Sequence, residues 1–128
     1  MELTDIPARV WDFIENHIDT VPQLEALLLI YGRDRDGSWT VAEIATRIYV
    51  GTAPAHAILE TLRRRGLIVV EGETATYRRK STPEQVALIE CVSDAYRRNL
   101  VPLATFIHSK ASAPVREFAR AFEIKKDR

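Results

Sequence analysis

Residues 38–79 read SWTVAEIATRIYVGTAPAHAILETLRRRGLIVVEGETATYRR and contain the patterns that decide the fold. Thr40 with Glu43 forms a capping box, and the apolar spacing that follows it predicts a helix over 41–49. A second amphipathic helix is predicted over 53–65 after a brief turn. Two short helices joined in this way indicate a helix-turn-helix.

The second helix is bounded by Thr52, a predicted N-cap, and by Gly66, which is expected to take a left-handed conformation. Beyond Gly66, residues with strand-like alternation lie on both sides of Glu71-Gly72-Glu73, which predicts a two-stranded hairpin. Helix, turn, helix and hairpin follow one another in the order of a winged helix-turn-helix domain.

The segments on either side of this core are also predicted to be helical. Helices are expected over 7–18, 22–31, 83–109 and 114–123. Thr20 is expected to cap the second of these, and a Thr82–Gln85 capping box to open the third. The predicted fold class is therefore mainly α with a small β-hairpin wing, a winged helix-turn-helix with a long C-terminal helix. We expect a winged helix-turn-helix domain over 1–80 with its core at 38–79, and a dimerisation helix with a short tail helix over 81–128.

The helix predicted over 83–109 has an apolar stripe close to a coiled-coil seam, because its apolar residues recur every three or four positions. We expect the stripe to form a homodimer contact. Its predicted contact residues are Ile89, Val92, Tyr96, Leu100, Leu103 and Ile107. In the alternative arrangement, this helix packs back on residues 7–31 of the same chain. Pro102 removes one backbone donor and crowds Arg98, so a kink is expected there.

Composition excludes several classes of protein. Of the 128 residues, 46% are hydrophobic and 28% are charged, which is ordinary globular usage rather than that of a disordered chain. No apolar run approaches the roughly 18 to 20 residues that span a bilayer, so no membrane partner is expected. The first ten residues lack the features of a signal peptide, and a cytoplasmic location is expected.

The formal net charge is zero, from 18 basic and 18 acidic residues, which argues against nucleic-acid binding by bulk charge alone. The charges are unevenly distributed. Residues 1–44 hold three basic and nine acidic residues, a difference of −6, and residues 45–128 hold the other 15 basic and nine acidic residues, a difference of +6. The basic part could face an anionic partner, the two parts could contact head to tail, or both could be solvated surfaces.

Catalysis and metal binding find no support in the sequence. His17, His56 and His108 stand far apart and Cys91 is the single cysteine, so no zinc-ligand spacing exists. The five glycines mark turns rather than a phosphate-binding loop, and no nucleophile-elbow motif is present. We expect no enzyme activity, no cofactor and no metal. Cys91 is expected to be a buried small apolar residue, with a redox-sensing thiol as the alternative.

The stretch from 38 to 79 resembles the core of MarR-like winged-helix transcription regulators. The resemblance lies in the capped run TVAEIA, in the apolar face of the second helix, and in RRRGLI leading into the hairpin. It implies that the second helix enters the major groove of DNA while the wing meets phosphates or the minor groove. It also implies double-stranded DNA and a second copy of the chain as partners.

The resemblance assigns roles to particular residues. Thr52, His56 and Ala57 would face base edges, and Arg47 on the preceding helix is a further candidate contact. The residues expected nearer the phosphates are Arg63, Arg64, Arg78 and Arg79.

Two features depart from the pattern of a strong DNA reader. The outward start of the second helix has no Arg, Asn or Gln for a bidentate base contact, and Glu71 and Glu73 at the wing tip would repel phosphates. The alternative function is therefore a winged-helix adaptor that binds another regulatory protein rather than DNA.

Overall fold

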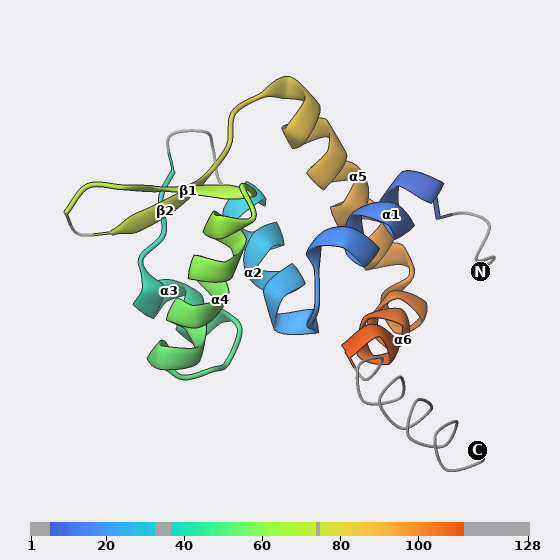
Figure 1. Ribbon diagram of the computed structural model, residues 1–128, viewed down its shortest axis with the longest axis horizontal. Helices are drawn as coiled ribbons and strands as arrows, with labels where there is room; N and C mark the ends of the chain where they lie inside the picture. The colour runs from blue at the N-terminus through green and yellow to red at the C-terminus, as the bar shows by residue number, and fades with distance from the viewer. Residues whose placement is uncertain (1–5, 33–36, 74, 112–128) are drawn as a thin grey trace, which may run out of the picture.

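The computed structural model describes residues 6–32, 37–73 and 75–111 (Figure 1). Its elements are α1 (Ala8–His17), α2 (Val21–Gly32), α3 (Val41–Arg47), α4 (Thr52–Arg64), β1 (Ile68–Glu71), β2 (Thr76–Arg79), α5 (Pro83–Arg98) and α6 (Leu100–Ala111). The predicted fold class is confirmed, because a mainly helical chain carries a helix-turn-helix, α3 and α4, followed by an antiparallel hairpin. The tail helix predicted over 114–123 lies outside the described residues.

The starts of α2 and α3 follow the local signals in the sequence. The Thr40 hydroxyl accepts a hydrogen bond from the Glu43 amide at 3.1 Å, and the Glu43 carboxylate accepts one from the Thr40 amide at 2.9 Å. This is the predicted capping box. At the start of α2, the Thr20 hydroxyl accepts a hydrogen bond from the Gln23 amide at 3.2 Å, as expected of a cap.

Two other predicted caps are wrong. Gly51, not Thr52, is the N-cap of α4. Pro54 has no amide hydrogen to donate to a Thr52 cap, and the Ala55 amide donates to the Gly51 carbonyl at 3.1 Å. The predicted Thr82–Gln85 capping box is also absent, since Thr82 makes no side-chain cap bond and Gln85 interacts with the Tyr31 phenol instead.

The hairpin is joined to the rest of the chain through β2. β1 and β2 are in register with Ile68 opposite Arg79. Trp39 adds an antiparallel bridge to Tyr77, and each residue donates its amide to the other's carbonyl at 2.8 Å. This bridge ties the segment before α3 to β2.

Gly66 turns the chain from α4 into the hairpin with a φ of +76°, the left-handed conformation that was predicted. We expect Gly66→Val to lower the free energy of unfolding by about 1 kcal/mol or more, because a β-branched residue is disfavoured at this φ. An added Cβ would meet only the Lys80 ammonium, at 3.7 Å, so the loss comes from the backbone. Urea unfolding measures it. The control is Gly32→Ala in helical α2, where a Cβ meets nothing within 4 Å and a neutral or stabilising effect is expected. A neutral Gly66→Val would contradict the left-handed turn.

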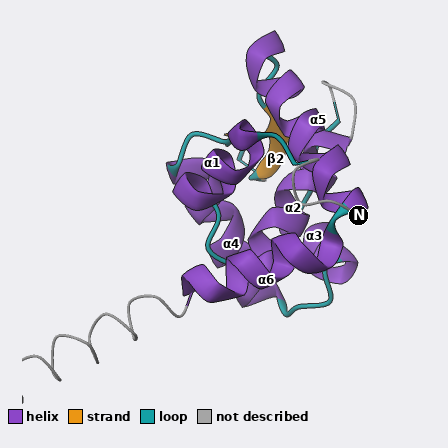
Figure 2. Ribbon diagram, turned by 90° about the vertical axis from the view of Figure 1, so that its right-hand side faces the viewer, coloured by secondary structure: helices purple, strands orange, loops and turns teal. Residues whose placement is uncertain are grey.

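α2 occupies the centre of the molecule, with α1, α5 and α6 on one side and α3, α4 and the hairpin on the other (Figure 1). Figure 2 views the molecule from the side of α1, α5 and α6, with the hairpin behind. α2 is apolar nearly all round and supplies four fully buried side chains, Leu24, Ala26, Leu27 and Ile30. One hydrophobic core therefore includes residues on both sides of residue 80, and the predicted division into 1–80 and 81–128 stays a prediction.

The helix predicted over 83–109 is two helices, α5 and α6, separated at Asn99. Asn99 departs from helical geometry, with a φ of −134° and a ψ of 49°, and its side-chain amide donates to the Ala95 carbonyl at 3.1 Å. Its own carbonyl accepts from the Leu103 amide at 3.1 Å and so starts α6. Pro102 then lies in the first turn of α6, where a missing amide hydrogen is tolerated. The expected kink is therefore a full break, three residues before the proline.

The predicted homodimer seam lies inside one chain. Five of its six side chains are buried against α1 and α2, which is the alternative arrangement considered from the sequence. These five are Ile89, Val92, Tyr96, Leu103 and Ile107. They are already in the core and cannot line a contact with a second copy. Leu100 alone is exposed, at 52%, because the break at Asn99 turns it away from the stripe.

Candidate nucleic-acid interface

The first turns of α4 present an exposed and uncharged face. Ala55, Leu59 and Leu62 are buried on its inner side. The exposed side consists of Thr52, Ala53, Pro54, His56 and Ala57. The predicted base-facing residues are therefore all accessible, but none has the bidentate geometry of Arg, Asn or Gln.

Arg47 lies in the last turn of α3 and is exposed. The guanidinium carbon of Arg47 lies 5.4 Å from the centroid of the Trp39 ring, in a cation–π contact. Because Trp39 is buried and bridged to β2, this contact holds the Arg47 side chain near a residue tied to the wing.

Glu60 joins the end of α4 to the hairpin. Its Oε1 accepts from Arg63, at 3.1 Å from Nε and 2.7 Å from Nη2, and its Oε2 accepts from the Tyr77 hydroxyl at 2.8 Å. The hydrogen bonds from Arg63 and then Tyr77 hold the pKa of the Glu60 carboxyl at about 2. Burial and then the Glu60 carboxylate raise the pKa of Tyr77 to about 12. Arg63 is therefore already paired within the protein.

The shifted pKa values of Glu60 and Tyr77 predict that the protein loses stability at both ends of the pH scale. The pKa of Glu60 is lowered from 4.5, so its contribution is complete above pH 4.5 and is lost as the pH falls toward 2. The pKa of Tyr77 is raised from 10.0, so its contribution is complete below pH 10 and is lost as the pH rises through 12. We expect Glu60→Gln to reduce the acid loss and Tyr77→Phe to reduce the alkaline loss, measured as unfolding free energy against pH. Unchanged pH profiles in these variants would contradict the assignment.

Arg64 and Arg78 supply further cations. Arg64 is exposed, and its Nη2 makes a long contact of 3.4 Å with the Thr61 hydroxyl. Arg78 forms an ion pair with Glu71 across the hairpin, with 2.7 Å between Nη2 and Oε2. Hydrogen bonding from Arg78 lowers the pKa of the Glu71 carboxyl, so the wing's own arginine partly offsets its negative charge.

Arg79 is directed into the protein. Its Nη1 donates to the Tyr31 carbonyl at 3.1 Å, and the side chain is half-buried between the hairpin and α2. The structure does not support the predicted phosphate contact, because this guanidinium holds the base of the hairpin on α2.

α3, α4 and the hairpin lie side by side at one end of the molecule (Figure 1). The structure thus brings the exposed start of α4 to the same end as four of the five arginines predicted to contact DNA. These are Arg47, Arg63, Arg64 and Arg78.

Comparison with known proteins supports a fold and no closer relationship. No protein-family model matches the chain, and no curated protein matches it. Among solved structures, a MarR family transcriptional regulator from Silicibacter pomeroyi is similar over 92% of this chain and 84% of its own, with 18% identity and a TM-score of 0.54. The YusO protein from Bacillus subtilis is similar over 97% of this chain and 84% of its own, with 20% identity and a TM-score of 0.53. A MepR–DNA complex from Staphylococcus aureus is similar over 97% of this chain and 92% of its own, with 15% identity and a TM-score of 0.55.

The chain has a MarR-like winged-helix fold. In this MarR-like fold, α3 and α4 form the helix-turn-helix and the β1–β2 hairpin is the wing. Sequence reasoning missed Glu60 and Tyr77 at the junction of α4 and the wing. The spacing of Glu60 and Arg63 on one helix face is a usable signal for their pairing, whereas nothing local links either residue to Tyr77.

The remaining predicted candidates do not gather into a second site. Among the residues described, no group of three or more His, Cys, Asp or Glu side chains could hold a metal ion. Cys91, predicted to be a buried small apolar residue, is a free thiol that is half-buried against the core. None of the helices described is long and apolar enough to cross a membrane.

Proposed function

We propose that the protein is a transcriptional regulator that binds double-stranded DNA, with α4 in the major groove and the wing on the phosphate backbone. The observation that carries the proposal is the exposed start of α4 in a MarR-like fold, with Arg64 in the last turn of the same helix, Arg47 in the last turn of α3 and Arg78 on the wing. A structure with the same fold is a complex of MepR with DNA, which supports this use of the fold.

Thr52 and His56 would meet base edges, and the arginines would meet phosphates. Arg63 contributes least, because Glu60 already takes two of its hydrogen bonds. With alanines and a proline around His56, preference for the specific site over random DNA is expected near the low end of the usual range, about 10³. The regulator is proposed to act in the cytoplasm, the location expected from the sequence.

We further propose a homodimer, whose two α4 helices would read two half-sites. Since the predicted seam is internal, the start of α6 is the proposed contact. Leu100 is 52% exposed and Val101 is 71% exposed, and exposed large apolar residues of this kind fit a protein contact.

The test is binding of the full-length protein to a fragment from upstream of its own gene, at salt concentrations from about 50 to about 200 mM. Affinity should fall steeply with salt, because each neutralised phosphate releases condensed counterions. His56→Ala should lower the preference for this fragment over random DNA, since a base-facing side chain carries sequence information. If no genomic fragment binds near about 150 mM salt, and nuclease leaves the lysate partners unchanged, the protein-adaptor alternative replaces the proposal.

A further inference from the structure

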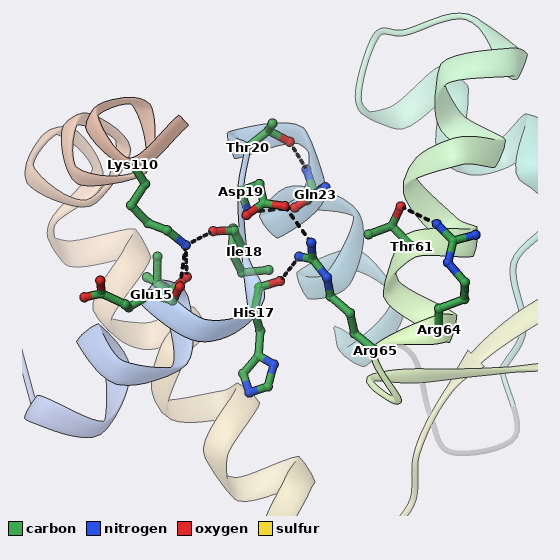
Figure 3. Close-up of polar contacts among 11 residues, drawn as sticks. Glu15, His17, Ile18, Asp19, Thr20, Gln23, Thr61, Arg64, Arg65 and Lys110 are labelled. Carbon is green, nitrogen blue, oxygen red and sulfur yellow. Dashed lines mark hydrogen bonds and ion pairs between the residues drawn. The ribbon is translucent and has the colours of Figure 1, made fainter. Parts of the chain in front are cut away.

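The C-terminal end of α1 is held by two cations from distant parts of the chain (Figure 3). Lys110, at the end of α6, donates from Nζ to three backbone carbonyls, two of them at 2.7 Å. These carbonyls belong to Ile14, Glu15 and Ile18. Arg65, the C-cap of α4, donates from Nη1 to the His17 carbonyl at 2.5 Å and from Nη2 to the Asp19 carboxylate at 2.6 Å.

These contacts fit the electrostatics of a helix end. The Ile14 carbonyl also accepts the Ile18 amide at 3.0 Å. The last carbonyls of a helix carry its partial negative charge, so charged donors are favourable there. Charge-assisted hydrogen bonds of this length are the stronger kind. The pKa of His17 is lowered by burial and then by Arg65 and Lys110, so its ring stays uncharged at neutral pH and adds no third positive charge.

Arg65 also lies at the corner where α4 turns into the wing. The next residue, Gly66, makes the left-handed turn, and the Leu67 carbonyl accepts from the Tyr31 hydroxyl at 2.6 Å. The corner is thus fixed to α2 through Tyr31 and to the α1–α2 junction through Arg65. Any shift of the end of α1 would pull on the residue that precedes the wing.

The side chains of three consecutive arginines at the end of α4, residues 63–65, therefore have different partners. Arg63 is paired with Glu60 on the face toward the wing, and Arg64 is exposed beside Thr61. Arg65 instead reaches the His17 carbonyl and the Asp19 carboxylate at the end of α1 (Figure 3). Arg65, which the sequence did not predict as a DNA contact, is no part of the proposed DNA surface.

We propose that Arg65 and Lys110 form a clamp on the C-terminal end of α1 and are positioning residues for DNA binding. Through the clamp, the position of α6 sets the position of the corner between α4 and the wing. This inference rests on the proposed function for its consequence in DNA affinity. The mechanical link itself requires no DNA.

The first experiment measures amide hydrogen exchange in the full-length protein without DNA. We expect Lys110→Met to speed exchange about threefold to tenfold in the 66–71 segment, because the end of α1 loses its ammonium partner. Lys110→Arg, which keeps a cationic donor, should restore protection. The matched control is Arg97→Met, which removes an exposed cation of α5 that pairs with Asp94. Unchanged exchange at 66–71 in Lys110→Met, with faster exchange only around 14–18, would overturn the link.

Global unfolding is distinguished from loss of the clamp by the α2 amides, which should keep their protection. If Lys110→Met unfolds, the clamp is tested instead by comparing amide exchange at 66–71 in wild type, Lys110→Arg and Arg65→Lys. Arg65→Lys keeps a single donor group in place of the fork, so its 66–71 segment should exchange faster than that of wild type. No difference among these three proteins would overturn the clamp.

The second experiment measures affinity for the upstream fragment against salt. We expect Arg65→Met and Lys110→Met each to weaken binding about threefold to tenfold without changing the salt slope, because neither residue meets a phosphate. Arg64→Met should instead flatten the slope by about 0.9. The double variant Arg65→Met with Lys110→Met should lose less than the two single losses combined, since both act on one helix end. A flattened slope in Arg65→Met would overturn the positioning role. If wild type binds no DNA but exchange at 66–71 responds to Lys110, the proposed function fails and the clamp stands.

Discussion

We expect Leu103→Glu to unfold the protein and Leu100→Glu to leave it folded, although both residues belong to the same apolar stripe in the sequence. Leu103 is fully buried in the core between α6 and its neighbours. An unpaired carboxylate there costs several kcal/mol, which is comparable with the total stability of a small domain, about 5 to 15 kcal/mol. Leu100 is 52% exposed and is the first residue of α6, where a carboxylate is favourable by about 0.3 to 1 kcal/mol.

Thermal unfolding followed by circular dichroism measures the difference, and sedimentation of the same variants tests the proposed dimer. Leu100→Glu should be a folded monomer if the start of α6 is the contact between copies. If the Leu103→Glu variant is folded and monomeric, this result would support the homodimer contact predicted from the sequence and would contradict the internal packing of α6.

Features set by neighbouring residues were predictable from the sequence. The capping box of Thr40 and Glu43 requires two side chains three positions apart and their own backbone, so its signal is complete within a short stretch. Gly66 is similar, because a glycine after an amphipathic helix offers the left-handed turn directly. The order of helices and hairpin followed from such local signals, and so did the winged-helix fold.

Features set by distant partners were not predictable. A stripe of apolar residues shows that a helix is covered on one side but not by which chain, and the stripe ending at Ile107 is covered by α1 and α2. The left-handed Tyr49, with a φ of 59°, carried no signal, since a tyrosine there is unfavourable by local rules. Arg78 and Arg79 are consecutive residues of β2 and point to opposite faces of the hairpin, and the distant α2 decides which of these faces is covered.

We expect the triple variant Arg47→Ala, Arg64→Ala and Arg78→Ala to lose most of its affinity for DNA. Each side chain would neutralise one phosphate, so the slope of log affinity against log salt should flatten by about 0.9 per residue, or about 2.7 in total. The loss should be largest near about 50 mM salt and should apply equally to specific and random DNA, because phosphates carry no sequence information. Fluorescence anisotropy across a salt series measures both quantities. A triple variant with the slope of wild type would place the DNA on another surface.

Glu71→Gln should have the opposite effect on the same surface. Glu71 holds Arg78 in an ion pair at 2.7 Å, so Glu71→Gln removes this ion pair and a carboxylate that repels phosphate. We expect a higher affinity and a slope steeper by up to about 0.9. Glu73→Gln is the matched control, since it removes the same charge from an exposed residue of the wing turn. If Arg78 contacts a phosphate once its ion pair with Glu71 is lost, Glu71→Gln should strengthen DNA binding more than Glu73→Gln. Adding Arg78→Ala to each variant should then abolish the difference. Equal gains from the two glutamines would mean that the wing acts only through its overall charge, without Arg78 reaching a phosphate.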